Sequence, residues 1–232
     1  MENTVENQKT QFWAKRAASA ISVMRDQKIA GLFPKNEGWR NVVEHELVES
    51  EAVDVLGEML GLSVADRSDL RIAALAHDIF KRKEIEGARE KGSEEFDNSV
   101  SEQSEFLRLK GYPEEIIILT QAVGHMAFNR FINDYHSLSL SEKIMHYIDD
   151  ITLRSDLVTL EKRINYLIDN PAYNDLNERG RKIYDGKTLF EVQAEISEKI
   201  QIEFAQALDI DDPAALPLVI REKIEQRIKN SS

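Results

Sequence analysis

Histidine and aspartate residues stand at three places in the sequence where their neighbours are apolar. His45 lies in the middle of an expected helix. His77 and Asp78 are adjacent at the end of a second helix, and Asp149 lies in a third. Imidazole and carboxylate groups suit Mn, Fe, Co, Ni, Zn or Mg as ligands. Because one adjacent His-Asp pair cannot complete a metal site, other helices must bring further ligands to it. The residue types alone leave two interpretations open, a metal site in a helical protein and ordinary hydrogen-bonded core histidines.

Several nearby side chains compete for such roles. His125 ends another apolar helix. Asp150 follows Asp149, and neighbours on a helix point about 100° apart, so only one of the two should face a metal. His146 lies one turn before Asp149 and is expected to pack or to form a hydrogen bond. His136 lies in an expected loop and should be exposed.

Long helices are the elements expected to position these side chains. The chain has 5 Pro and 10 Gly in 232 residues, which argues against a turn-rich β architecture. Residues 81–99 and 129–139 are expected to be connections, the first with room for one short helix. One helix carries Asp149 and is capped by Ser139 or Ser141. Apolar residues at helical spacing predict the others, at about 8–30, 39–60, 66–78, 100–109, 114–126, 187–208 and 214–229.

The composition excludes several classes of protein. Cysteine is absent, so disulfides, zinc-thiolate sites and cysteine nucleophiles are excluded. The formal charge of −12, without a run of Lys or Arg, argues against binding to long nucleic acid. It still allows a local basic pocket for one small phosphorylated ligand. The start of the chain lacks a signal-peptide pattern, and no apolar run has membrane-spanning length. We therefore expect a cytoplasmic protein without a membrane partner.

Three segments resemble, in order and spacing, the H…HD…D signature of the HD superfamily of metal-dependent phosphohydrolases. Residues 39–45 (WRNVVEH) resemble the helix of the family's first His. Residues 72–81 (IAALAHDIFK) are similar to its AALLHDIGK segment, and residues 141–149 (SEKIMHYID) to EKILYIAD. The resemblance covers about residues 37–165. It implies an all-α fold, with an HD-domain helical core over 37–168, an N-terminal helix within 1–36 that packs on it and a C-terminal helical extension over 169–232.

The resemblance also implies a function and a site. One divalent metal ion would be held by His45, His77, Asp78 and Asp149, with Asp149 rather than Asp150 facing it. The expected reaction is hydrolysis of a phosphate ester or anhydride in a small, nucleotide-like substrate by a metal-activated water. Asp78 could bind the metal and also orient that water. Lys81 matches the family lysine that contacts substrate phosphate, although a solvated lysine in the KRK run is the alternative.

Further residues would serve the phosphate side of such a site. His125 matches a position where several members place a His for a second metal or for phosphate, and Gly124 would leave backbone room. Members with two metals usually carry another His near the position of Asp97. Its absence favours one metal, with a second held by His125 and Asp97 as the alternative. Arg40 and Arg154 could reach a phosphate, and surface ion pairs are the competing interpretation.

Two other functions remain to be weighed. A non-catalytic HD module that binds a nucleotide or a partner protein is the main alternative, but such a module would be expected to have lost His45 or the His77-Asp78 pair. HD-type di-iron oxygenases need more His ligands than this chain offers. Arg163 has no assigned role. The region after about residue 170 is interpreted as a helical cap over the site or as the interface of a homo-oligomer.

Overall fold

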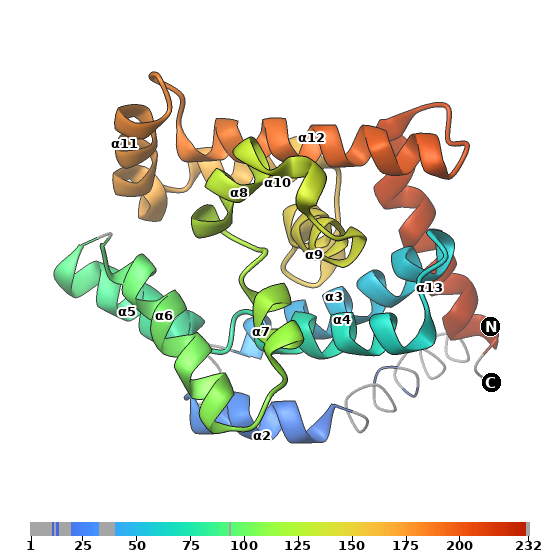
Figure 1. Cartoon of the computed structure of the whole chain (residues 1–232), viewed down its shortest axis with the longest axis horizontal. Helices are drawn as coiled ribbons and strands as arrows, with labels where there is room; N and C mark the ends of the chain where they lie inside the picture. The colour runs from blue at the N-terminus through green and yellow to red at the C-terminus, as the bar shows by residue number, and fades with distance from the viewer. Residues whose placement is uncertain (1–10, 12, 14–19, 33–39, 93, 231–232) are drawn as a thin grey trace.

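The described chain is built almost entirely from helices, as predicted from the sequence. The computed structural model describes residues 11, 13, 20–32, 40–92 and 94–230 (Figure 1). Within these ranges the only strands are β1 (Thr152–Leu153) and β2 (Asp156–Leu157), which pair antiparallel. Every helix in the same ranges is too short or too polar to be a membrane span. The helices are α2 (Ile21–Ile29), α3 (Arg40–Met59), α4 (Val64–Ala76), α5 (Lys81–Lys91), α6 (Glu94–Leu109), α7 (Glu114–Thr120), α8 (Phe128–Asn133), α9 (Leu140–Ile151), α10 (Leu160–Asp169), α11 (Asn174–Ile183), α12 (Leu189–Ala207) and α13 (Leu216–Asn230), with short 3-10 turns η1 (His125–Ala127), η2 (Tyr135–Ser137), η3 (Pro171–Tyr173) and η4 (Pro213–Ala215).

Helix α9 runs through the middle of the molecule and contacts α3, α4, α7, α10 and α12. Figure 1 views α9 nearly end-on, between α12 on one side and α3 and α4 on the other. A capping box starts the helix: the Ser139 hydroxyl accepts from the Glu142 amide, and the Glu142 carboxylate accepts from the Ser139 amide. Ser139, not Ser141, is therefore the cap. Most side chains of α9 are buried, so Asp149 is presented from a helix that packing holds on several sides.

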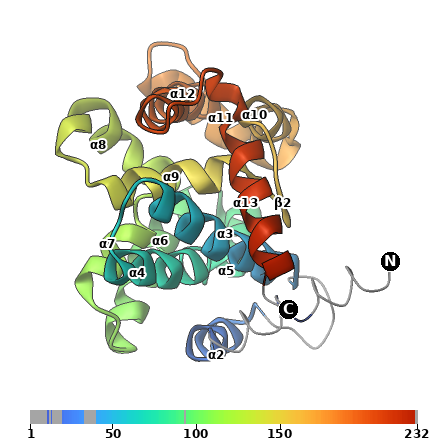
Figure 2. The same ribbon diagram turned by 90° about the vertical axis from the view of Figure 1, so that its right-hand side faces the viewer.

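The C-terminal helices share their core with the preceding part of the chain. Helix α12 crosses α9 (Figure 1), and the ring of Phe204 meets that of Tyr147 edge-on, with the ring centroids 5.9 Å apart. The Tyr147 hydroxyl also donates to Gln201 at 2.9 Å. Helix α13 packs against α3 (Figure 2), and Arg227 donates there to Glu51 at 2.8 Å. One hydrophobic cluster includes residues from 52 to 228, so the C-terminal extension completes the core instead of standing apart from it.

Only part of the range predicted as the N-terminal helix is described. Helix α2 lies within the predicted range 8–30, of which residues 8–10, 12 and 14–19 lie outside the described residues. Val23 of α2 is buried in a cluster with Leu75 and Ala76 of α4. Gln27 donates to the Leu75 carbonyl at 2.6 Å and to Glu46 of α3 at 2.5 Å. This helix therefore packs on α4, beneath the helices that carry the candidate site (Figure 1).

The prediction of connections at 81–99 and 129–139 is wrong. Helices α5 and α6 occupy most of the first range and pack side by side as a pair (Figure 1). The charged residues that suggested a loop form ion pairs at helical spacing, such as that between Arg82 and Glu86 at 3.0 Å. The second range contains most of α8 and a 3-10 turn, because Phe131 and Tyr135 bury their rings in the core.

Helix α11 and the hairpin of β1 and β2 were not predicted. Helix α11 is mostly polar, so it lacks the apolar repeat that marks a helix in sequence. Gly180 explains how such a helix can pack tightly against the start of α12. A Cβ atom at this position would come within 2.3 Å of the backbone nitrogen of Leu189. Only glycine permits this approach, which fixes α11 in place beside the core.

Candidate metal centre

Four side chains from three helices converge on one point in the interior. Helix α3 supplies His45 and Glu49, the residue after α4 supplies His77, and α9 supplies Asp149. One ligand atom from each lies within 4.8 Å of the others. The Nε2 atom of His45 is 3.0 Å from Glu49 and 3.5 Å from Asp149, and Nε2 of His77 is 3.4 Å from Glu49. This group, which we call the ligand cluster, could hold a metal ion.

Local structure aims the two imidazoles into the ligand cluster. His45 and Glu49 are four residues apart and so lie on one face of α3. His77 caps the C-terminal end of α4, and its Nδ1 contacts the carbonyl oxygen of Ala74 at 2.8 Å. Nδ1 of His45 contacts the carbonyl oxygen of Arg154, in the turn between β1 and β2, at 3.0 Å. Because each Nδ1 contacts a carbonyl oxygen, each Nε2 is the nitrogen that could bind a metal ion. This is the arrangement of histidines in known metal sites.

The polar atoms of the ligand cluster fit a cation. Glu49 is fully buried, yet neither of its carboxylate oxygens has a hydrogen-bond partner, and Nε2 of His77 has none either. Such groups are costly to bury unless something compensates them. Two imidazoles and two carboxylates are a donor set that suits a divalent transition metal.

The charged groups of the ligand cluster shift one another's pKa values. Burial alone would lower the pKa of His45 and His77, but the Glu49 carboxylate, helped by Asp149, outweighs burial and raises both values. Burial would raise the pKa of Asp149, but the hydrogen bond from His45 and the charge of His77 lower it well below its usual value. Without a metal, protons on the histidines therefore balance the carboxylates, and a cation would have to displace those protons.

Glu49 takes a place that was not predicted, and Asp78 lies beside the ligand cluster. The four-residue spacing from His45 to Glu49 was the signal available in the sequence. An Asp78 oxygen is 3.8 Å from Nε2 of His77, and the other oxygen is 3.4 Å from the Lys81 ammonium. Burial would raise the pKa of Asp78, but Lys81 and His77 lower it, so its carboxylate is ionised at neutral pH.

A small cavity of about 80 Å³ adjoins the ligand cluster. It is lined by His77, Asp78 and Asp149 from the site and by Lys81 and His125 from its surroundings. Asp78 and Glu84 raise the pKa of Lys81 despite burial, so this ammonium stays charged. The Lys81 ammonium and the His125 imidazole therefore lie at a cavity that borders the ligand cluster. Lys81 and His125 thus line the same cavity as His77 and Asp149 of the ligand cluster.

The glycine before His125 has a different role from the one expected. Gly124 has a φ of +74°, a conformation that side chains with a Cβ disfavour. A Cβ atom there would meet no atom within 4 Å, so backbone room is not the reason for glycine. The left-handed backbone turns the chain from α7 into η1 and points His125 at the cavity.

Asp97 links the wall of the cavity to the C-terminal helices. It contacts Nε2 of His125 at 2.6 Å and accepts two hydrogen bonds from the guanidinium of Arg179 in α11, at 3.2 Å and 2.5 Å. These bonds lower the pKa of Asp97 despite its partial burial, whereas burial lowers that of His125. Asp97 thus already has a cationic partner. Arg179 is 82 residues away in sequence and was not predicted.

Asp150 points away from the ligand cluster and towards α12. It is buried and accepts hydrogen bonds from Gln193 and Ser197, and His146 approaches it at 3.4 Å. His146 is buried, its Nδ1 contacts the Ala122 carbonyl at 2.8 Å, and its ring stacks on Phe131. These contacts tie α9 to its neighbours on the side opposite to the ligands.

Three arginines were singled out in the sequence, and each has a different position relative to the ligand cluster. Arg154 lies exposed in the hairpin turn with a φ of 58°, and its carbonyl, not its guanidinium, serves the site. Arg40 begins α3, but its side chain lies outside the described residues. Arg163 of α10 is close enough to Asp149 for its charge to help lower the pKa of that carboxyl. His136 is exposed, as expected.

Comparisons with models of protein families, with curated proteins and with solved structures found no match. Within the described part of the chain, the ligand cluster is the one group of three or more His, Asp or Glu side chains close enough to hold an ion.

Proposed function

We propose that the protein is a metal-dependent hydrolase of phosphate esters or anhydrides in a small, nucleotide-like substrate. The convergence of His45 and Glu49 of α3 with His77, which follows α4, and Asp149 of α9 carries this proposal. The buried Glu49 oxygens and Nε2 of His77, which have no hydrogen-bond partner, support a bound cation. The resemblance of the surrounding segments to HD phosphohydrolases supports the reaction. A divalent cation bound there supplies Lewis acidity and lowers the pKa of a water molecule that it binds.

The side chains around the small cavity would carry the remaining tasks. The Lys81 ammonium, held beside Asp78 at 3.4 Å, would neutralise a phosphoryl oxygen. His125 also lines the cavity, and its contact with Asp97 fixes the direction of its ring. With Nε2 turned to Asp97, a protonated ring would donate from Nδ1 to a second oxygen of the substrate. The ionised carboxylate of Asp78 would accept a hydrogen bond from the attacking water and so orient it. A cavity of about 80 Å³ admits one phosphoryl group, so the rest of the substrate would extend outside it.

A hydrolysis screen with defined metal loading tests the proposal. The protein is stripped with a chelator and reloaded with one metal at a time, among them Mn, Fe, Co, Ni, Zn and Mg. It is then assayed on nucleotides, dinucleotides and simple phosphoesters. We expect hydrolysis that depends on the metal, and its loss in His77→Ala and Asp78→Ala. His136→Ala and Asp211→Ala are matched controls, since both side chains are exposed and neither adjoins the ligand cluster.

The outcome distinguishes the enzyme from the non-catalytic module. Metal binding without hydrolysis of any substrate, with every metal, would contradict the proposed activity and favour a binding role. Hydrolysis that survives His77→Ala unchanged would contradict the assignment of the site, because that imidazole is one of the two that meet Glu49 and Asp149.

A further inference from the structure

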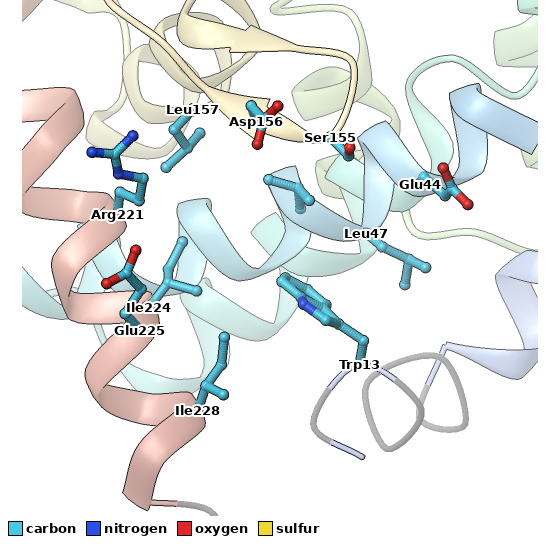
Figure 3. A pocket seen from close by; sticks show the side chains of 11 residues that line it. Trp13, Glu44, Leu47, Ser155, Asp156, Leu157, Arg221, Ile224, Glu225 and Ile228 are labelled. Carbon is cyan, nitrogen blue, oxygen red and sulfur yellow. The ribbon is translucent and has the colours of Figure 1, made fainter. Parts of the chain in front are cut away.

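A second, larger cavity lies on another face of α3. It has a volume of about 420 Å³ and is enclosed by α3, the hairpin of β1 and β2, α13 and Trp13 (Figure 3). None of its lining residues belongs to the ligand cluster. Glu44, Leu47 and Val48 line it from α3, and they lie about a third of the helix circumference away from His45 and Glu49. We call it the α3–α13 cavity.

The walls of the α3–α13 cavity are apolar. The Trp13 ring and aliphatic side chains surround the empty space in Figure 3. Small-molecule sites in proteins are mostly apolar concavities of roughly 300–1,000 Å³ with a few polar groups that fix orientation. Both the size and the lining of this cavity fall within that description. The aliphatic residues are Leu47, Val48, Leu157, Ile224 and Ile228.

The polar groups around the cavity are predominantly acidic. Asp156 and Glu225 contribute two carboxylates and Arg221 contributes one guanidinium, which leaves one negative charge in excess. Glu44 adds a further carboxylate that has a partner of its own. Figure 3 places Asp156 and Ser155 on one side of the space, opposite Trp13. A cation entering here would meet carboxylates from the hairpin and from α13.

We propose that the α3–α13 cavity binds a small organic cation with an apolar body, of the arylalkylammonium class. The ammonium group pairs with the carboxylate of Asp156, and the apolar body fills the space between Trp13, Leu47 and Ile224. This proposal does not depend on the hydrolase activity, because no residue of the ligand cluster takes part.

Binding is measured on metal-free protein, so that failure of the metal centre and failure of this proposal are distinguishable. The probe is 2-phenylethylammonium. Phenylacetate has the same ring with the opposite charge, and ethylammonium has the charge without the ring. We expect the probe to bind at least about tenfold more tightly than either control. Only the probe has both an apolar ring to contact the walls and a positive charge to pair with the carboxylates. The chain has two tryptophans, so in a Trp39→Phe background the fluorescence of Trp13 reports occupancy directly.

Two kinds of variant locate the site. Asp156→Asn is expected to weaken the probe about twofold to fivefold, since exposed charge pairs contribute modestly. Asp211→Asn removes the same charge from the loop between α12 and η4 and should leave binding unchanged. Ser155→Phe fills the cavity from an exposed position in the turn and should abolish binding.

Three results would overturn the proposal. The first is equal affinity for phenylacetate and the probe, because the carboxylates of the cavity would then not distinguish a cation from an anion. The second is full binding to Ser155→Phe, because the probe would then lie elsewhere. The third is a homodimer in sedimentation that Ser155→Phe dissociates, because the cavity would then be a contact between copies of the chain.

Discussion

Replacing Glu49 by glutamine is the sharpest test of the ligand cluster, because the residue was found only in the structure. Glu49→Gln keeps the size of the side chain and removes its charge. Glu49 is fully buried, and its oxygens lie 3.0 Å from Nε2 of His45 and 3.4 Å from Nε2 of His77. If Glu49 is a metal ligand, the variant should bind divalent metal more weakly while it keeps its fold.

The size of the loss follows from these distances. Two unit charges 3.0 Å apart attract by about 5.5 kcal/mol at an effective dielectric constant of about 20. Part of this is recovered, because repulsion between Glu49 and Asp149 disappears and because metal binding displaces protons that Glu49 also attracts. Taking about half, roughly 2.7 kcal/mol, the metal dissociation constant should rise about a hundredfold. The variant should also release fewer protons on binding metal, since Glu49 raises the pKa of both histidines.

Isothermal titration of the metal-stripped protein with Mn²⁺ or Zn²⁺ measures both quantities when it is repeated in buffers of different ionisation enthalpy. Glu58→Gln is the matched control, because it removes the same charge from the same helix nine residues further along, where the side chain is largely exposed. Circular dichroism of both variants checks the fold. Glu49→Gln with an affinity within about threefold of the parent, while Asp149→Asn loses binding, would refute the role of Glu49.

The remaining predictions concern proton competition, the phosphate side and the anchoring of α9. Because the pKa values of His45 and His77 are raised without metal, protons compete with the ion, and metal affinity should rise from pH 6 to pH 8; a flat profile would contradict this. Asp97→Asn should raise KM about fivefold to thirtyfold, the equivalent of roughly 1–2 kcal/mol, because the His125 ring and the Arg179 guanidinium lose the carboxylate that holds them in place; an unchanged KM would remove Asp97 from the substrate side. Burial raises the pKa of Asp150 to about 6, above its value in the unfolded chain, so ionisation costs stability as pH rises through that range. The difference in the free energy of unfolding between Asp150→Asn and the parent, measured with urea on metal-free protein, should therefore shift in favour of the variant by up to about 3 kcal/mol from pH 4 to pH 7.5. An equal difference at the two pH values would contradict the buried ionisation.

Sequence reasoning succeeded where apolar residues repeat at helical spacing. The ranges predicted at 39–60 and 187–208 correspond to α3 (Arg40–Met59) and α12 (Leu189–Ala207). It failed at α5 and α11, which are stabilised by ion pairs along the helix and by the close packing that Gly180 allows. Neither source of stability leaves an apolar pattern, so neither helix could be read from hydrophobicity.

The same limit governs the candidate site. His45, His77 and Asp149 stood out because polar side chains on apolar helices are conspicuous. Glu49 did not, since a glutamate with other glutamates nearby in the same helix usually faces water, and only the packing of α4 and α9 against α3 buries it. Arg179 reaches Asp97 from a helix that was itself unforeseen. Residues of the candidate site were therefore predictable where they differ from their neighbours in sequence. They were not predictable where only the tertiary packing brings them to the site.

The hairpin of β1 and β2 stands between two sites and belongs to both. Its turn offers the Arg154 carbonyl to Nδ1 of His45, and the next residues, Ser155 to Leu157, line the α3–α13 cavity. A displacement of this turn by an occupant of the cavity would rotate the imidazole that it restrains. Thermodynamic linkage requires the effect to be reciprocal, so any change that a bound cation makes in the affinity for metal must be matched by the metal's effect on the cation. The hairpin is thus the part of this otherwise helical protein through which two ligands could sense one another.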